Sequence, residues 1–380
     1  MAPRTRGTRG ANETVRHFLE QLVAGGEEVG LQVAVYQHGR LVIDAWAGLA
    51  DTATSRKVDG DTLFTVFSTT KGILYAAVHL LAERGSLSYE DPVARYWPDF
   101  AARSKAGITI GQVLDHSAGV PQMPEGTTVK DLCDWDRMCA AIADLPPLWE
   151  PGSKTGYHVY IIGWILGEVL RRIDGRPVSR FVQEEICSPP GLQNLFLGIP
   201  DGVESRVAAL VDAPPPDPAP AGPLPLLEKA IPPHLPAAAV LFNLPEVRRA
   251  CIPAAGGIMN ARDLARFYAS MVATGVDGTR LLPAERMALV ARERRRDVDQ
   301  VLGLEIRKGL GYFLPGPNAE SIIDSPGAFG HPGAGGSVGY ADPVHGLAVG
   351  FTKTLLVSPA DRWKTTDVKV TRKIREALGI

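Results

Sequence analysis

The chain has 380 residues, of which 45% are hydrophobic, and it carries 40 Lys and Arg against 42 Asp and Glu. This composition is typical of a globular protein and excludes wholesale disorder, while the net charge of −2 argues against a protein that binds nucleic acid by neutralising phosphates. The length predicts two packed regions, and the 40 Gly and 31 Pro residues predict many turns and long loops.

No segment of the sequence indicates a membrane or a secretion signal. The polar N-terminus is not followed by an apolar run long enough for a signal peptide, and the apolar segments near 72–82 and 159–166 are shorter than the ~18 residues that span a bilayer. The cysteines lack zinc-type spacing and favour a set of reduced thiols: Cys133, Cys139, Cys187 and Cys251. We therefore expect a cytoplasmic protein with no membrane partner.

The first third of the chain combines strand and helix signals. Apolar residues at helical spacing predict a helix over 13–24, and two β-rich runs, 31–36 and 41–46, flank a His-Gly turn and predict a hairpin. A further helix begins near Ile73 and ends at Gly85, which can cap it in the left-handed conformation. From there to about residue 210, helical patterns dominate.

The second half returns to strands. Ten prolines fall between residues 213 and 236 and predict a stiff surface loop rather than a proline motif for a protein partner. The following patterns predict, in chain order, a helix over 262–272, a strand-like segment over 301–314, a hairpin of 337–340 with 346–352, and a helix over 366–378.

Strands at both ends of the chain and helices in its middle predict a mixed α/β (α+β) fold. The expected architecture is a sheet flanked by the N- and C-terminal helices, with a mainly helical region inserted. We assign residues 1–75 and 245–380 to a discontinuous α/β domain and residues 76–244 to the helical domain. A functional site is expected in the cleft between them.

Phe67-Ser68-Thr-Thr-Lys71-Gly72, at the start of a predicted helix, is the first candidate for chemistry. The i, i+3 spacing places the Ser68 hydroxyl and the Lys71 amine on one helix face, beside the inward-pointing N–H groups of the helix start. A lysine shielded from water can lose its proton and serve as the base for such a hydroxyl. Taken alone, Ser-x-x-Lys is also compatible with a capping serine and a solvated lysine.

Two further segments carry candidate groups. Tyr157, before a predicted helix, could pass protons between a nucleophile and a leaving group, or could be a packing aromatic. The Gly-rich run from Gly330 to Ser337 leads into a strand whose edge could offer N–H donors to an oxyanion, or could be a loop without a ligand.

Taken together and in this order, the three segments resemble the serine β-lactamase and penicillin-binding-protein superfamily, with its Ser-x-x-Lys, Tyr-x-Asn and Lys-Thr-Gly motifs. Leu114-Asp-His116-Ser-Ala-Gly119-Val-Pro121 and Pro253-Ala-Ala-Gly256-Gly257-Ile-Met-Asn260 resemble two further stretches of that family. The resemblance covers roughly residues 13–354. It implies an antiparallel sheet of the β-lactamase/transpeptidase type.

The sequence departs from the β-lactamase pattern at two positions. Val159 stands where the family's Asn is expected, and His331-Pro-Gly333 replaces Lys-Thr-Gly. The missing Lys and Asn help bind the carboxylate and amide of a β-lactam, and a neutral Val and a His of pKa near ~6.5 offer less to an anion. The closest resemblance is to the family VIII carboxylesterases, and it implies an acyl ester as substrate.

The resemblance implies the following roles. Ser68 is the nucleophile, Lys71 its base and Tyr157 the proton relay. The N–H groups of Ser68 and Ala334 form the oxyanion hole, and the candidate substrate-binding residues are His331, Gly333 and His158. His331 would orient either Tyr157 or the substrate, and His158 could line the cleft or be a spectator beside Tyr157. The expected reaction is ester hydrolysis through an acyl-Ser68 intermediate on a small-molecule ester or amide, with no cofactor, no metal and no nucleic-acid partner.

Three alternatives stay open. They are an acyltransferase, a β-lactam or D-amino-acid amide hydrolase, and a non-catalytic binding module of the same fold. The acyl group, the alcohol and the oligomeric state cannot be derived from the sequence.

A competing motif is judged a decoy. Gly335-Gly-Ser337-Val-Gly339 fits the Gly-x-Ser-x-Gly nucleophile elbow, but that elbow needs a strand before it and a helix after it, and here a strand is expected to follow. His116 is expected to fix a loop by hydrogen bonds, and the basic run 292–297 to form a solvated helix end.

Overall fold

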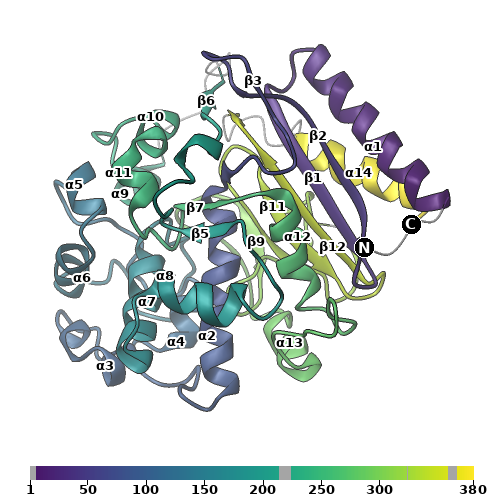
Figure 1. The fold of residues 1–380 in the computed structure, drawn as a ribbon. Helices are drawn as coiled ribbons and strands as arrows, with labels where there is room; N and C mark the ends of the chain where they lie inside the picture. Colours follow the sequence, from purple (N-terminus) through teal and green to yellow (C-terminus); the bar gives the residue numbers. More distant parts are fainter. Residues whose placement is uncertain (1–5, 214–223, 323, 358–365) are drawn as a thin grey trace.

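A six-stranded antiparallel sheet forms the centre of the fold in the computed structural model, which describes residues 6–213, 224–322, 324–357 and 366–380 (Figure 1). The N-terminal strands β1 (Gly30–Gln37) and β2 (Arg40–Asp51) form a hairpin. Its strand β1 also pairs with the C-terminal strand β12 (Leu347–Lys353), so β1 lies between β2 and β12. The strand order is β10-β11-β12-β1-β2-β3, where β3 is Arg56–Lys57, β10 is Phe329–Pro332 and β11 is Val338–Asp342.

Helices cover both faces of this sheet. The helices α1 (Arg6–Ala24) and α14 (Thr366–Leu378) lie side by side on one face (Figure 1), where Val15, Leu19 and Leu22 of α1 are buried. On the other face, α12 (Ala261–Ala269) packs against β1 and β12. Gly350 permits this approach, because a Cβ there would lie 2.4 Å from the carbonyl oxygen of Ala261.

The remaining helices gather beside the sheet, with α2 (Thr70–Glu83) and α7 (Ile161–Asp174) almost entirely buried among them. The others are α3 (Val93–Tyr96), α4 (Ile110–Leu114), α5 (Val129–Leu132), α6 (Trp135–Ala143), α8 (Val178–Phe181), α9 (Pro225–Ala230), α10 (Ala238–Asn243), α11 (Pro245–Arg249) and α13 (Ala284–Val290). One buried apolar cluster includes residues of α1, the central sheet, α2 and α7. The two regions therefore share a continuous core, and the boundaries predicted at 75/76 and 244/245 stay a prediction.

Three short sheets complete the architecture. In the first, β7 (Gly257–Met259) pairs with β4 (Phe64–Thr65) and β5 (Leu195–Leu197). In the others, β8 (Arg295–Val298) pairs with β9 (Glu305–Lys308), and β6 (Val211–Asp212) with β13 (Leu355–Leu356). Because β4 directly precedes the Ser68 segment, its pairing with β7 anchors that segment to the fold.

The structure confirms the predicted fold class, both hairpins and the helices predicted at 13–24, 73–85, 262–272 and 366–378. The first helix begins earlier than predicted, at Arg6, and the ends of the others shift by three residues or fewer. No helix among the described residues is long and apolar enough to cross a bilayer.

Three expectations need correction. Part of the proline-rich segment 213–236 is helical, since Pro225 opens α9 with the backbone angle that a helix start requires, while 214–223 lie outside the described residues. Only Glu305–Lys308 of the segment 301–314 forms a strand. The basic run 292–297 is no helix end: Arg295 begins β8, and its guanidinium lies 3.8 Å from the buried carboxylate of Asp115.

Candidate active site

Ser68 lies on the 3₁₀ turn η1 (Phe67–Thr69), immediately before α2. The Val66 N–H donates to the Gly257 carbonyl oxygen at 2.9 Å, which ties the turn to β7. Phe67, directly before Ser68, has φ of +48°, a left-handed conformation that costs a residue with a side chain roughly 1–3 kcal/mol. Its ring packs edge-on against Phe242 at 5.0 Å. Strain is thus held in place next to Ser68.

The Lys71 amine is buried next to the Ser68 hydroxyl. Its Nζ lies 3.0 Å from Ser68 Oγ, 2.7 Å from the Val159 carbonyl oxygen and 2.9 Å from the Ala254 carbonyl oxygen, and the side chain is fully buried. Burial lowers the pKa of Lys71 well below its ordinary value. A neutral amine has two N–H groups and one lone pair. If both carbonyls take an N–H, the lone pair is left for the Ser68 proton.

Tyr157 stands beside this pair, on a loop held by three successive backbone N–H groups. The N–H of Gly156 donates to the His116 carbonyl oxygen at 3.0 Å, that of Tyr157 to Asp299 Oδ1 at 2.8 Å, and that of His158 to His116 Nδ1 at 3.0 Å. Lys71 Nζ lies 4.8 Å from the centre of the Tyr157 ring. The structure therefore brings Ser68, Lys71 and Tyr157 together as the sequence predicts.

The two histidines near Tyr157 are structural. His158 is buried, its Nδ1 bonds the Gly156 carbonyl oxygen at 2.7 Å, and its Nε2 accepts the Val120 N–H at 3.3 Å. Burial lowers the pKa of His158 to about 4, so the ring is neutral and both nitrogens are in use. The structure does not bring His158 to the substrate cavity, contrary to the expected binding role. His116 fixes the loop, as predicted.

Ala334 follows β10 in a turn that faces η1. The carbonyl oxygen of Ser337 accepts both the Gly333 N–H at 2.6 Å and the Thr69 hydroxyl at 3.2 Å, so the turn is fastened to the segment that carries Ser68. Neither the N–H of Ser68 nor that of Ala334 bonds to an acceptor within the part of the chain that the structure describes. Both are available to an oxyanion.

Ser337 contributes its backbone carbonyl to this turn, and its surroundings are not those of a nucleophile. It is buried, with 2% of its surface exposed, and the strand β11 follows it instead of the helix that a nucleophile elbow requires.

His331 packs near Tyr157 and is not among the residues that line the cavity. It is buried, its ring centre is 6.0 Å from that of Tyr157 and 4.7 Å from that of Phe313, and its Nδ1 bonds the Pro332 carbonyl oxygen at 2.8 Å. Burial lowers the pKa of His331 well below its ordinary value, so the ring is neutral. Its Nε2 has no hydrogen-bond partner among the described residues. The ring can pack against Tyr157, but it does not line the substrate cavity.

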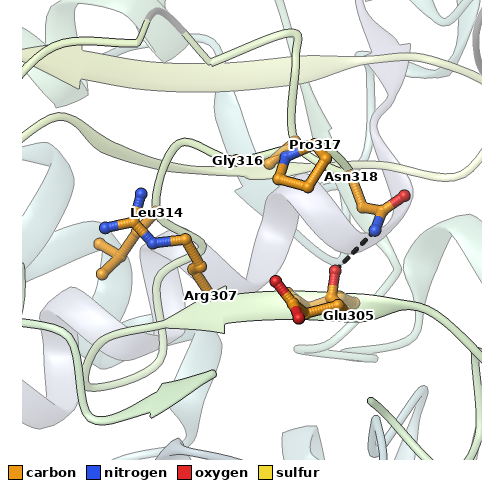
Figure 2. A pocket seen from close by; sticks show the side chains of 8 residues that line it. Glu305, Arg307, Leu314, Gly316, Pro317 and Asn318 are labelled. Atoms are coloured by element: carbon orange, nitrogen blue, oxygen red, sulfur yellow. Dashed lines mark hydrogen bonds between the residues drawn. The ribbon is translucent and has the colours of Figure 1, made fainter. Parts of the chain in front are cut away.

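A cavity of about 240 Å³ opens beside Ser68. The residues that line it are uncharged and mostly apolar: Phe67, Ser68, Val159, Tyr160, Ile231, Pro232, Pro233, Leu235, Pro236, Ala237, Ala238, Leu241, Ala255 and Ala334. Three prolines of the segment 213–236 thus border the cavity. A second hollow, between β9 and the 314–319 segment (Figure 2), has no room for a water molecule, and Asn318 Nδ2 donates to the Glu305 carbonyl oxygen across it at 2.7 Å.

Several site groups carried no sequence signal. The carbonyls of Val159 and Ala254 hold Lys71 through the main chain, which any residue could supply. Asp299 binds the Tyr157 N–H from 142 residues away, and no spacing rule connects the two. Within the described residues, no group of three His, Cys, Asp or Glu side chains is arranged to hold a metal ion.

Comparisons with known proteins identify the family and the fold. The family described as Beta-lactamase matches residues 15–369. Esterase/beta-lactamase LipL of Mycobacterium tuberculosis (strain ATCC 25618 / H37Rv) is 34% identical over 352 residues, which cover 87% of this chain and 78% of LipL.

Two solved structures are similar over nearly the whole chain. The crystal structure of a family VIII carboxylesterase superposes with a TM-score of 0.86 at 32% identity, covering 98% of this chain and 99% of the esterase. A penicillin-binding protein homolog from Caulobacter crescentus superposes with a TM-score of 0.85 at 32% identity, covering 100% of this chain and 99% of the homolog. The resemblance inferred from the motifs is confirmed.

Proposed function

Because the chain belongs to the beta-lactamase family and has esterase relatives, we propose that it hydrolyses carboxylic esters through a covalent acyl-Ser68 intermediate. The observation that carries this proposal is the buried Lys71 amine, 3.0 Å from the Ser68 hydroxyl and bonded to two carbonyls. A solvated lysine would be protonated at neutral pH and could not accept a proton. Burial makes this one a base.

The reaction follows from the placement of these groups. As Ser68 Oγ forms its bond to the acyl carbon, Lys71 takes the hydroxyl proton and the N–H groups of Ser68 and Ala334 hold the oxyanion. The ester C–O bond then breaks, and the proton passes through Tyr157 to the leaving alcohol. In the second half, water gives its proton to the same groups, attacks the acyl carbon and releases the acid with Ser68 restored.

The cavity favours a neutral acyl ester as substrate. None of the side chains that line it is charged, and the apolar walls formed by Val159, Leu241 and the prolines suit a hydrocarbon chain. A β-lactam carries a carboxylate, which such a wall would have to desolvate without a partner. β-Lactam hydrolysis is nevertheless the second candidate, since the relative LipL is described as an esterase/beta-lactamase.

The nucleophile is tested by labelling with a fluorophosphonate. We expect labelling of the wild-type protein, full labelling of Ser337→Ala and none of Ser68→Ala, with the adduct mapped to the peptide that contains Ser68. Labelling that survives Ser68→Ala but is lost in Ser337→Ala would overturn the mechanism. A wild-type protein that takes no label would point to a non-catalytic binding protein.

The reaction class is tested by steady-state kinetics. We expect kcat/KM for short p-nitrophenyl esters to exceed that for nitrocefin by at least about 100-fold, equivalent to about 2.7 kcal/mol of differential transition-state stabilisation. Comparable values would favour the β-lactamase. An added alcohol that diverts most of the acyl group into a new ester would indicate an acyltransferase.

A cytoplasmic location is part of the proposal and rests on the cysteines. Cys133, Cys139, Cys187 and Cys251 form no disulfide. We therefore expect four titratable thiols in protein unfolded without reductant.

A further inference from the structure

A buried ion pair lies behind the loop that carries Tyr157. Lys308, the last residue of β9, places its Nζ 2.6 Å from Asp299 Oδ2, and the side chains of the two residues are 1% and 0% exposed. Burying two charges costs several kcal/mol each, and an ion pair is seldom the most stable way to fill such a space. Stability alone therefore accounts poorly for this pair, whose contacts lead to the Tyr157 loop.

The other carboxylate oxygen of Asp299 faces the site. Its Oδ1 accepts the N–H of Tyr157 at 2.8 Å, as well as the N–H groups of Val301 at 3.0 Å and Leu302 at 3.1 Å. Burial acts to raise the pKa of Asp299, but the Lys308 charge and these N–H donors prevail and lower it. Asp299 is thus an ionised carboxylate, and charge strengthens each of the hydrogen bonds that it accepts.

The bond to Tyr157 is part of a wider attachment. The Gln300 N–H donates to the Thr155 carbonyl oxygen at 2.9 Å, so the segments 155–157 and 299–302 are joined at two points. From the opposite side, His116 binds the N–H groups on both sides of Tyr157, at Gly156 and His158. The backbone of Tyr157 is therefore fixed between a neutral histidine and a charged carboxylate.

We propose that the Asp299–Lys308 pair is a positioning element for Tyr157. Lys308 keeps Asp299 ionised and oriented, and Asp299 fixes the Tyr157 backbone so that the phenol ring stays beside Lys71. This inference rests on the proposed function, in which the Tyr157 hydroxyl carries the proton. Neither member of the pair lines the cavity, so the effect is expected on kcat rather than on substrate binding.

The test compares two double variants that differ only in the acceptor at position 299. Lys308→Met with Asp299→Asn removes both charges and keeps an amide oxygen for the Tyr157 N–H, while Lys308→Met with Asp299→Ala removes the acceptor as well. We expect kcat to fall by about 100-fold from the first to the second, the loss typical of a misplacement near 1 Å, with KM changed less than about twofold. In a Tyr157→Phe background, the same exchange should change kcat less than about threefold, because the hydroxyl that it positions is absent.

Glu168→Gln is the matched control. Glu168 is a 1% exposed carboxylate bonded to Arg171, Arg172 and Trp135, away from Tyr157, so its loss should lower the Tm and leave kcat unchanged. Equal kcat for the two double variants, both folded by circular dichroism, would overturn the positioning role while leaving the esterase mechanism intact. If Tyr157→Phe alone retained full kcat, the proton relay itself would be wrong, and the positioning role would fall with it.

Discussion

Gly333→Ala tests whether the turn after β10 places an oxyanion donor. A Cβ at position 333 would lie 2.3 Å from the carbonyl oxygen of Val66 and 2.9 Å from Thr69 Oγ1. Ordinary van der Waals contacts begin near 3.4 Å. The turn must therefore move away from η1 by about 1 Å, and the Ala334 N–H moves with it. Loss of one oxyanion donor costs about 2.7–4 kcal/mol, which corresponds to a 10²–10³-fold lower kcat.

The assay is hydrolysis of p-nitrophenyl butyrate by Gly333→Ala, with the fold checked by near-ultraviolet circular dichroism and the Tm. Gly107→Ala is the control, because a Cβ at position 107 meets no atom within 4 Å. We expect normal kcat for the control and a loss of about 10²–10³-fold for Gly333→Ala, with a smaller change in KM. A folded Gly333→Ala protein whose kcat is within threefold of wild type would refute the role assigned to Ala334.

Three further predictions concern the base, the cavity and the core. Burial lowers the pKa of Lys71, so kcat/KM should stay high as the pH is lowered through the ordinary lysine range and should fall only at lower pH. Lys71→Arg is always protonated and should lose at least about 10³-fold in kcat at every pH tested. The pKa of Lys71 is lower in the folded than in the unfolded protein, so the folded state gains stability as the amine loses its proton. This stability is fully present above the pKa of the unfolded state and is lost as the pH falls through the pKa of the folded state. Ile231→Trp, at a wall residue that is 40% exposed, should lower kcat/KM for an octanoate ester more than for an acetate ester; an equal loss would place the acyl chain elsewhere. Lys105→Met removes the hydrogen-bond donor to the carbonyl oxygens of Ala102, Ala143 and Leu145. Denaturant unfolding should show a free energy of unfolding lower by about 1–3 kcal/mol, with kcat retained, and unchanged stability would contradict this.

The sequence predicts which candidate residues lie together where they are close in the chain. Ser68 and Lys71 lie one turn apart on the same segment. The glycines around Ala334 predict a turn that another part of the backbone approaches closely, and Val66 does so at Gly333. The hairpins and terminal helices were also predicted, because each has a regular apolar period and a turn residue at its end. Here local propensity and tertiary structure agree.

The failures share a physical cause, which is that the missing information is tertiary. His158 is adjacent to Tyr157 in the chain, but its ring turns inward to bond Gly156 and Val120, and adjacency does not show direction. The basic run 292–297 has the composition of a solvated helix end, yet it forms part of β8 because Arg295 finds the buried carboxylate of Asp115. Asp299 and Lys308 belong to no sequence motif. Lys308 pairs with Asp299, and Asp299 binds the backbone N–H of Tyr157, which any residue at position 157 could supply.

Under the proposed function, Val159 changes the cavity wall and leaves the hold on Lys71 intact. In the β-lactamases that the motif resembles, an Asn is expected at this position; here the Val159 carbonyl oxygen holds Lys71 Nζ at 2.7 Å, a bond that does not depend on the side chain. The valine side chain instead forms part of the cavity wall. The main chain can therefore keep the lysine in place while the side chain exchanges an amide for a hydrocarbon surface. A charged or amide-bearing ligand would lose its hydration at such an apolar wall without gaining a polar partner. This cost is the physical reason why we propose a neutral ester as the substrate.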